Sequence, residues 1–291
     1  MSPKPLALKI LDWLSLILLA VATYLVFFYA PMERVMGNVQ RVFYFHVATG
    51  WVGYLAFYAA VINGILVLKQ GQGNSRPWNI IAWITGVIGF LAYGMYRSRE
   101  IAALEGIGVG LMLVASFSGG IGYGLSRKQD GLHWDVIGLA AVELGLVFSF
   151  INIVTGAIWA RPAWNTWWTW DPRLVTATIM ELIYFAYMML RQGIENPLQR
   201  ARFGAVYAIL GFVSVPLSYF SISIWRSIHP VVFGAENPEA KASPGLTSDM
   251  RVVFFFSLIV FTIIFIDLFW NRIRLGHFTE KIAQRKMESL S

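Results

Sequence analysis

The 291-residue sequence contains no cysteine, and only 13% of its residues are charged. The absence of cysteine excludes disulfide bonds, thiolate metal sites and thiol catalysis. The charged fraction lies well below the roughly 25% typical of soluble domains, while 57% of the residues are hydrophobic. One soluble core could not bury so much apolar surface. The composition therefore predicts a polytopic membrane protein whose spans are α-helices.

Several functional signals are also missing. No sequence repeat is evident, and the glycines of 118–124 lie in an apolar run, where they indicate close helix packing rather than phosphate binding. The net charge of +7 is spread over short loops and tails, so it does not predict a nucleic-acid partner. No cleavage site follows the first apolar run, which is expected to remain as the first span. No nucleophile–base set or carboxylate pair indicates an enzyme.

Long apolar runs dominate the rest of the chain. Each is close to the ~20 residues that a membrane-crossing helix needs. They predict eight spans, at 12–30, 44–68, 78–96, 102–125, 136–158, 174–190, 203–225 and 251–270. The third and fourth are separated by a short charged segment and are expected to form a tight helical hairpin. Pro216 predicts a kink in the seventh span. The polar tail 271–291 is expected to be a short cytoplasmic helix with a frayed end.

Positive charges in the loops orient these spans, because Lys and Arg accumulate on the cytoplasmic side. With eight spans, both termini share one face with most of the loop cations. That face is predicted to be cytoplasmic. Its cations include Lys4, Lys9, Lys69, Arg76, Arg127, Lys128, Arg191, Arg200 and Arg202, together with those after residue 271. The external face then holds the segments 31–43, 97–101, 159–173 and 226–250, and Arg34, Arg41, Arg97 and Arg99 are exceptions to the charge bias.

The segment 159–174, W-A-R-P-A-W-N-T-W-W-T-W-D-P-R-L, concentrates tryptophan. Five of the chain's 12 tryptophans fall within twelve residues of it. They are Trp159, Trp164, Trp167, Trp168 and Trp170. An interfacial aromatic belt would spread around the bundle, and two prolines argue against one continuous helix through the segment. We expect an external loop whose indole faces can hold a flat, apolar, partly charged ligand.

Two of the four histidines are expected on the same external face. His46 begins the second span and His229 follows the seventh, whereas His133 and His277 fall on the cytoplasmic side. Imidazole is a common axial ligand of haem iron, and two imidazoles can fill both axial positions. Alternatively, each histidine caps a helix end or lies at the headgroup level. Their shared location with the tryptophans favours ligation.

Charged residues near this face are candidates for supporting roles. Guanidinium groups bind carboxylates in bidentate fashion, and the candidates are Arg161, Arg173, Arg41 and Arg226. Asp171 is an alternative local partner for Arg173. Glu143 and Glu181 fall inside predicted spans, where a carboxylate is usually paired or functional. Glu181 is expected below the tryptophan loop, where it would support the site.

Three segments resemble the CcmC branch of the tryptophan-rich WWD family of haem-handling proteins. They are R-V-F-Y-F-H-V at 41–47, the run 150–174 with its W-x-T-W-W-x-W-D-x-R-L pattern, and P-L-S-Y-F-S-I-S-I-W-R-S-I-H at 216–229. With the spans around them they cover about two thirds of the chain. Arg173 and Leu174 after the Asp-Pro pair favour CcmC over the related CcmF and CcsA branches.

The resemblance implies that His46 and His229 ligate the iron of haem b, bound as cargo, while the WWD loop holds the macrocycle. It also implies transfer of haem to the periplasmic chaperone CcmE. The further implied partners are an ABC transporter of CcmA and CcmB and the small protein CcmD, in a bacterial-type inner membrane. The family usually has six spans, so 78–125 resembles an inserted pair. Asn165 stands where glycine is usual, and a left-handed backbone is expected there.

Three other functions stay open at this point. One is haem delivery or ligation of the CcsA type. Another is secondary transport of an apolar anion, which predicts broken helices, repeat symmetry and a site at the membrane midplane. The third is an assembly scaffold, in which the tryptophan loop is only a docking surface.

Overall fold

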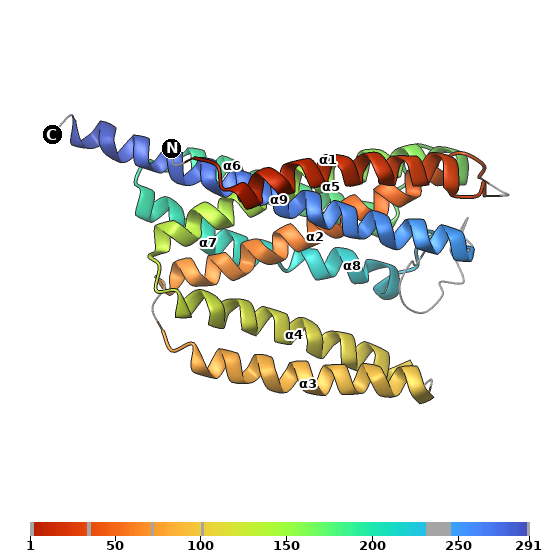
Figure 1. Cartoon of the computed structure of the whole chain (residues 1–291), viewed down its shortest axis with the longest axis horizontal. Coiled ribbons are helices and arrows are strands. Elements are labelled where there is room, and N and C mark those ends of the chain that lie inside the picture. Colours follow the sequence, from red (N-terminus) through yellow and green to blue (C-terminus); the bar gives the residue numbers. More distant parts are fainter. Residues whose placement is uncertain (1–2, 34–35, 71–72, 100–101, 231–245, 290–291) are drawn as a thin grey trace. The chain divides into compact units, whose positions relative to one another are not determined.

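The computed structural model describes residues 3–33, 36–70, 73–99, 102–230 and 246–289 (Figure 1). Helices account for most of these residues, and the described chain forms no strand, which confirms the predicted all-α class. The elements are α1 (Leu6–Tyr24), the π-helical turn η1 (Leu25–Tyr29), α2 (Gln40–Leu68), α3 (Arg76–Arg99), α4 (Ala102–Ser126), α5 (Gly131–Trp164), α6 (Pro172–Gln192), α7 (Pro197–Gly211), α8 (Ser214–Ile224) and α9 (Ser248–Glu288).

Seven helical segments within the described residues are long and apolar enough to cross a membrane. They correspond to all the expected spans except 78–96. That run is helical as predicted, in α3, but is not among the seven. The backbone hydrogen bonds of a helix are satisfied within the segment, which is what a lipid environment requires. The chain is therefore a multi-pass membrane protein.

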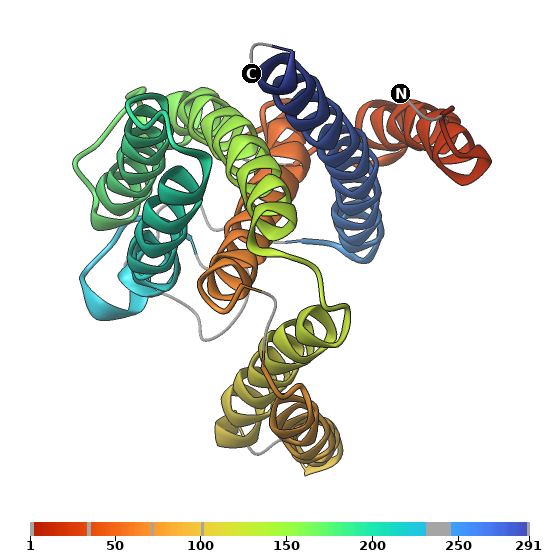
Figure 2. The same ribbon diagram turned by 90° about the vertical axis from the view of Figure 1, so that its left-hand side faces the viewer.

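Contacts divide the chain into two compact units. One comprises Met1–Ala59, Leu139–Gln192 and Leu210–Ser291, and the other Ala60–Gly138 and Gly193–Ile209. The second unit contains α3 and α4, which lie side by side as the predicted hairpin (Figure 2). A Cβ atom at Gly89 would lie 2.9 Å from the backbone oxygen of Gly108. Only a small residue permits so close an approach of the two helices.

The glycine-rich run of α4 also has the packing role expected for it. A Cβ atom at Gly122 would overlap the side chain of Asn79 in α3, and one at Gly124 would overlap Leu66. A buried cluster completes this unit, formed by Leu66, Val67, Ile121, Leu125, Trp134, Ala201 and Ala205. The glycines therefore let α4 approach two neighbouring helices.

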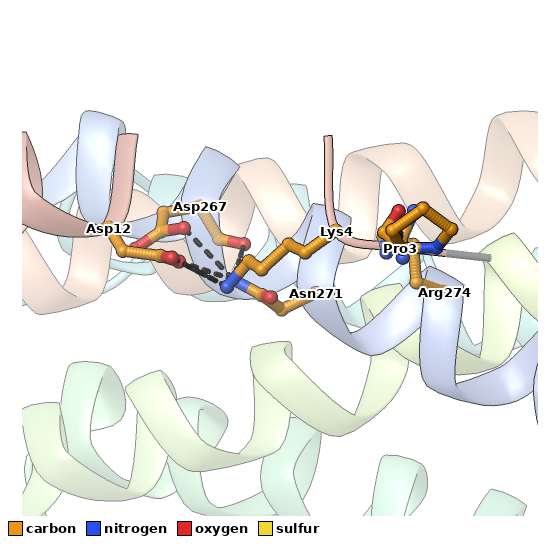
Figure 3. Close-up of polar contacts among 6 residues, drawn as sticks. All are labelled: Pro3, Lys4, Asp12, Asp267, Asn271 and Arg274. Carbon is orange, nitrogen blue, oxygen red and sulfur yellow. Dashed lines mark hydrogen bonds and ion pairs between the residues drawn. The ribbon is translucent and has the colours of Figure 1, made fainter. Parts of the chain in front are cut away.

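In the first unit, α1 lies along α9 (Figure 1). Their polar contacts are drawn in Figure 3. The ammonium group of Lys4 lies 2.6 Å from a carboxylate oxygen of Asp12. The side-chain amide of Asn271 donates to Asp12 at 3.1 Å and to Asp267 at 3.0 Å. Carboxylates are costly in a membrane unless they are paired, and this network joins the first and last helices of the chain.

The aliphatic and aromatic core of the same unit is built around α2, α5 and α9. One buried cluster joins Val26, Ala30, Met36, Phe43, Tyr44, Trp159, Met250, Val253 and Phe254. A second contains Val52, Ala56, Phe148 and Phe265. The rings of Phe57 in α2 and Tyr184 in α6 stack with their centroids 3.8 Å apart. These contacts fix the positions of α2, which carries His46, and α5, which carries Trp159 and Trp164.

Glu143 has the partner that its position inside a span required. Its carboxylate receives Arg272 of α9 at both oxygens, with the guanidinium Nη2 at 2.7 Å and Nε at 2.5 Å. Both side chains are partly shielded from solvent, which strengthens a bidentate charge pair. The expectation that an intramembrane carboxylate is paired is confirmed at this position.

Three boundaries differ from the prediction or refine it. The seventh span is divided into α7 and α8 at residues 212–213. Pro216 lacks the backbone N–H that would donate to the oxygen of residue 212, four positions earlier, so the helix is interrupted there. The helix α5 continues to Trp164 through Pro162, beyond the expected end at 158, so the first six residues of the expected tryptophan loop are helical, and Trp159 packs into the buried core. The tail is helical, but it continues the last span to Glu288 rather than forming a separate helix. Residues 231–245 of the expected external loop lie outside the described residues.

Breaking the Glu143–Arg272 pair on one side should destabilise the protein. We expect Glu143→Leu to leave the Arg272 guanidinium without its acceptor and to lower stability by about 1–3 kcal/mol. The double variant Glu143→Leu, Arg272→Leu should recover much of that loss, because no uncompensated charge remains. Thermal unfolding of the detergent-purified variants measures both effects. Lys9→Gln, at an exposed position of α1, is the control, and equal unfolding temperatures for all variants would contradict the prediction.

Candidate functional site

His46 lies in α2 with its imidazole against α5. Its Nδ1 atom is 3.0 Å from the backbone oxygen of Asn152 and 3.2 Å from the hydroxyl oxygen of Thr155. The ring lies over Gly156, where a Cβ atom would come within 2.9 Å of the imidazole Cε1. A larger residue at 156 would push the ring away. These three positions of α5 therefore determine where the imidazole of His46 lies.

Asp171 immediately precedes α6 and connects it to the segment that follows α8. Its carboxylate is buried and accepts from the backbone N–H of Arg173 at 3.0 Å, which caps the helix. The same oxygen accepts from the hydroxyl of Ser227 at 2.9 Å, and the other accepts from the N–H of Ile228 at 2.8 Å. The N–H of His229 in turn donates to the Ser227 hydroxyl at 3.1 Å. Asp171 thus holds the backbone that carries His229.

The ring of His229 faces the end of α5. It meets the indole of Trp164 edge to face, with centroids 5.9 Å apart, and its Nδ1 lies 3.0 Å from the backbone oxygen of Pro230. Burial among these neighbours, with the nearby charges of Arg173 and His46, lowers the pKa of His229 to about 3. The imidazole is therefore neutral at neutral pH, which is the form that ligates metals. Because the charge of His46 contributes to this pKa shift, the two predicted histidines lie within electrostatic range of each other.

The five clustered tryptophans have different environments. Trp159 is 4% exposed in the core and meets Trp164 edge to face, with centroids 5.5 Å apart. Trp168 and Trp170 form a second such pair at 6.1 Å. Trp167 and Trp170 are 59% and 84% exposed. Buried Trp159 supports the site, Trp164 contacts a histidine, and Trp167 and Trp170 offer indole surface to a ligand or to lipid.

Of the four candidate arginines, Arg226 lines the hollow formed by residues 169–172 and 226–228, and the other three contact the protein itself. The guanidinium of Arg161 donates to the backbone oxygen and the side-chain oxygen of Asn165, at 2.6 and 2.8 Å. Arg173 donates to the backbone oxygen of Ser218, and its guanidinium lies over two rings, 5.7 Å from Tyr54 and 6.0 Å from Tyr219. Arg41 donates to the backbone oxygen of Phe27. Their binding of ligand carboxylates stays a prediction.

Asn165 has the left-handed backbone expected at this position. Its φ is +56°, a region that glycine and asparagine tolerate better than other residues. The two hydrogen bonds from Arg161 hold the residue in that conformation. The chain can therefore turn sharply between α5 and the exposed tryptophans although glycine is absent.

Sequence reasoning missed the residues that hold the histidines. Asn152 and Thr155 lie one turn apart in a very apolar helix, and their spacing relative to Gly156 was the available signal. Ser227, two residues before His229, gave none. Glu181 was expected to support the site, and its carboxyl group is hydrogen bonded to the Ser149 hydroxyl, one turn of α5 below Asn152. An open hollow lies at the start of α6 and is lined by residues 169–172 and 226–228.

The fold and this site together define the class of protein. It is a multi-pass helical membrane protein in which His229 contacts Trp164 of the tryptophan-rich segment, at the end of α5, and His46 lies against the same helix at Asn152 and Thr155. The polar residues that hold the histidines are hydrogen bonded, and two of them, Asp171 and Ser227, are buried, as expected of a built site rather than a chance cluster.

The chain belongs to the family described as CcmC, Heme exporter protein C, whose sequence model matches residues 132–289. Similar proteins carry the name Heme exporter protein C. The one from Bradyrhizobium diazoefficiens is 32% identical over 156 residues, which are 54% of this chain and 56% of that protein. The one from Rhodobacter capsulatus is 31% identical, over 54% of this chain and 69% of its own length. The Escherichia coli K12 protein is 28% identical over 63% and 78%.

These matches cover part of this chain and part of each similar protein. The chain spans only 56% and 59% of the length of the relatives from Bradyrhizobium diazoefficiens and Paracoccus denitrificans. The family match includes the tryptophan segment and His229 but begins after α2, so it does not include His46. The case for His46 therefore rests on its contacts with α5 and its proximity to His229.

Substitutions of Asn165 should separate backbone strain from the loss of a hydrogen bond. Alanine at a left-handed position costs roughly 1–2 kcal/mol, so we expect Asn165→Ala to lower the unfolding temperature clearly. Asn165→Gly relieves the strain and should cost less, while Asn165→Asp retains the acceptor for Arg161 and serves as the matched control. Thermal unfolding in detergent gives the ranking. Equal losses for the alanine and glycine variants would show that the positive φ is unimportant.

Proposed function

We propose that this protein binds haem as cargo, with His46 and His229 as the two axial ligands of the iron, and presents it to a haem chaperone during c-type cytochrome biogenesis. The observation that carries the proposal is that the imidazole of His229 lies edge to face with Trp164 of α5 and within electrostatic range of His46, whose ring lies against the same helix. Two neutral imidazoles are a common axial pair for haem iron. The names of the similar proteins, which describe heme export, support the same cargo.

The tryptophan segment fits the rest of such a ligand. Haem is flat and largely apolar, and indole rings stack on aromatic faces while their N–H groups meet polar edges. Trp167 and Trp170 are the most exposed tryptophans of the segment. We assign them to contacts with the macrocycle, whereas buried Trp159 supports the surrounding core. Arg161, Arg173 and Arg41 remain candidates for the haem carboxylates if they exchange their present protein partners.

Orientation and partners follow from the loop charges and the family. With α3 counted as the eighth span beside α4, the positive loops support our proposal that both termini lie in the cytoplasm and the tryptophan segment on the external side of a bacterial-type inner membrane. We propose a CcmE-like chaperone as the acceptor, and a CcmA–CcmB transporter with a CcmD-like subunit as the complex in which the protein works. The protein's part in this scheme is to hold and hand over haem rather than to transform it.

The two histidines should each be required for haem binding. We expect the detergent-purified protein, supplied with haem, to show the Soret band of a six-coordinate iron. His46→Ala and His229→Ala should each shift or abolish the band, because one axial ligand is lost in each. The control is His133→Ala, a histidine at the other end of α5. Absorption spectra and haem titration measure the effect.

Two results would contradict the proposal. One is a wild-type protein that shows no band even after haem is supplied, which would favour an assembly scaffold or an anion transporter. The other is a wild-type spectrum that persists in either histidine variant.

Asp171 should act on haem binding through His229. We expect Asp171→Ala to leave the Ser227 hydroxyl and the Ile228 N–H without an acceptor, at about 1–3 kcal/mol. If this free-energy loss destabilises the haem-bound conformation relative to the haem-free one, haem affinity drops by roughly 5- to 150-fold. Asp171→Asn keeps one acceptor oxygen and should be milder. The control is Asp249→Asn, an exposed acid in the first turn of α9.

A double variant tests whether Asp171 acts through the histidine. Asp171→Ala should weaken haem binding little further once His229 is alanine, because there is no ligand left to position. Additive losses in haem titrations would instead mean that Asp171 contacts the cargo directly.

A further inference from the structure

The Nδ1 atom of His46 is surrounded by atoms from one turn of α5. Besides the backbone oxygen of Asn152 and the hydroxyl of Thr155, the side-chain nitrogen of Asn152 lies 3.1 Å away. An imidazole nitrogen can donate or accept, so these contacts alone do not say which ring nitrogen carries the proton. The other hydrogen bonds of the same groups decide it.

Each neighbouring donor has another acceptor. The Thr155 hydroxyl donates to the backbone oxygen of Ile151 at 2.7 Å, so it offers a lone pair to His46. One N–H of the Asn152 amide donates to the backbone oxygen of His46 at 2.6 Å, and the second lies on the same nitrogen, 3.1 Å from Nδ1. The nearest neighbour of Nδ1 is the backbone oxygen of Asn152 at 3.0 Å, which can only accept a hydrogen bond. The arrangement favours a proton on Nδ1 and leaves the lone pair on Nε2, the atom that would ligate iron.

The packing around this contact is reciprocal between the two helices. His46 of α2 lies over Gly156 of α5, and Asn152 of α5 lies over Gly50 of α2, where a Cβ atom would come within 2.7 Å of the amide nitrogen. In each helix the polar residue is followed four positions later by the glycine, so both lie on one face. Both side chains are thus held between two backbones that glycine allows to approach closely.

We propose that Asn152 and Thr155 are positioning residues that hold His46 in its Nδ1–H tautomer and direct Nε2 towards the bound iron. This inference rests on the proposed haem-binding function and deepens it. Second-shell acceptors of this kind fix the orientation of a ligating histidine and raise its basicity. A more basic imidazole stabilises ferric iron more than ferrous iron, so these residues also lower the reduction potential of the bound haem.

The test combines haem titration with redox titration of the detergent-purified full-length protein. Thr155→Val removes the acceptor with little change of shape, and Asn152→Ala removes the amide contact to the His46 backbone. Gly156→Ala leaves every hydrogen-bonding group present but displaces the ring. We expect each to lower haem affinity by roughly 10- to 100-fold. Thr155→Val should also raise the reduction potential of the haem that remains bound.

Two variants are matched controls. Thr155→Ser retains the hydroxyl and should restore both affinity and potential. Gly53→Ala alters the same helix pair where a Cβ atom has ordinary contacts, 3.4 Å from the nearest atom of Ser149, and should behave as wild type. A generally weakened helix pair would affect Gly53→Ala as well, and would not be rescued by serine at 155.

The outcomes separate this inference from the proposed function. A wild-type protein that binds haem and needs His46, but whose affinity and potential are unchanged in Thr155→Val and Gly156→Ala, would overturn the inference and leave the proposed function intact. A wild-type protein that binds no haem would overturn both. Equal loss in Thr155→Val and Thr155→Ser would show that bulk rather than the hydroxyl matters, which also contradicts the inference.

Discussion

The close approach of α2 and α5 is the constraint on which the site depends. Two glycines allow it, Gly50 on one helix and Gly156 on the other, and each accommodates a polar side chain from the opposite helix. In a membrane, helices associate through packing and hydrogen bonds rather than through the hydrophobic effect, so small residues at the contact have unusual weight. A larger residue at either position would separate the helices and move His46 from the backbone that holds it.

The second histidine is held differently. His229 follows the end of α8, and its position depends on the carboxylate of Asp171, which also caps α6. One acid thereby links the tryptophan segment, the start of a span and the segment bearing the histidine. Because Asp171 caps α6, the start of that helix fixes the position of its backbone and hence of its carboxylate. The two histidines are thus positioned by separate means, one by helix packing and the other by a buried carboxylate.

Polar residues elsewhere in the spans follow one physical rule. Glu143 pairs with Arg272, Glu181 contacts Ser149, and Lys4 pairs with Asp12. Lipid provides no alternative partners, so intramembrane charges and carboxyl groups meet each other or other polar groups. These contacts join α5 to α9, α5 to α6, and the N-terminal segment to α1. The helices that carry His46 and Asn152 are in this way connected to the rest of their unit.

The sequence by itself determined the class of this protein and much of its site. Low charge and long apolar runs required a helical membrane protein, and Pro216 and Asn165 marked a helix break and a left-handed turn that the structure has. The tryptophan cluster and the two histidines could be predicted on one face, because counting the spans assigns each loop to one side of the membrane. What the sequence did not determine was the role of each residue there. Of the five tryptophans, Trp159 is a core residue, Trp164 and Trp168 contact other rings, and Trp167 and Trp170 are exposed. The roles of Asn152, Thr155 and Ser227 come only from contacts between segments that are distant in the sequence. Apolar patterning is local and can be read along the chain, whereas hydrogen bonds between segments as far apart as His46 and Asn152 depend on how the helices pack, and only the tertiary structure decided that.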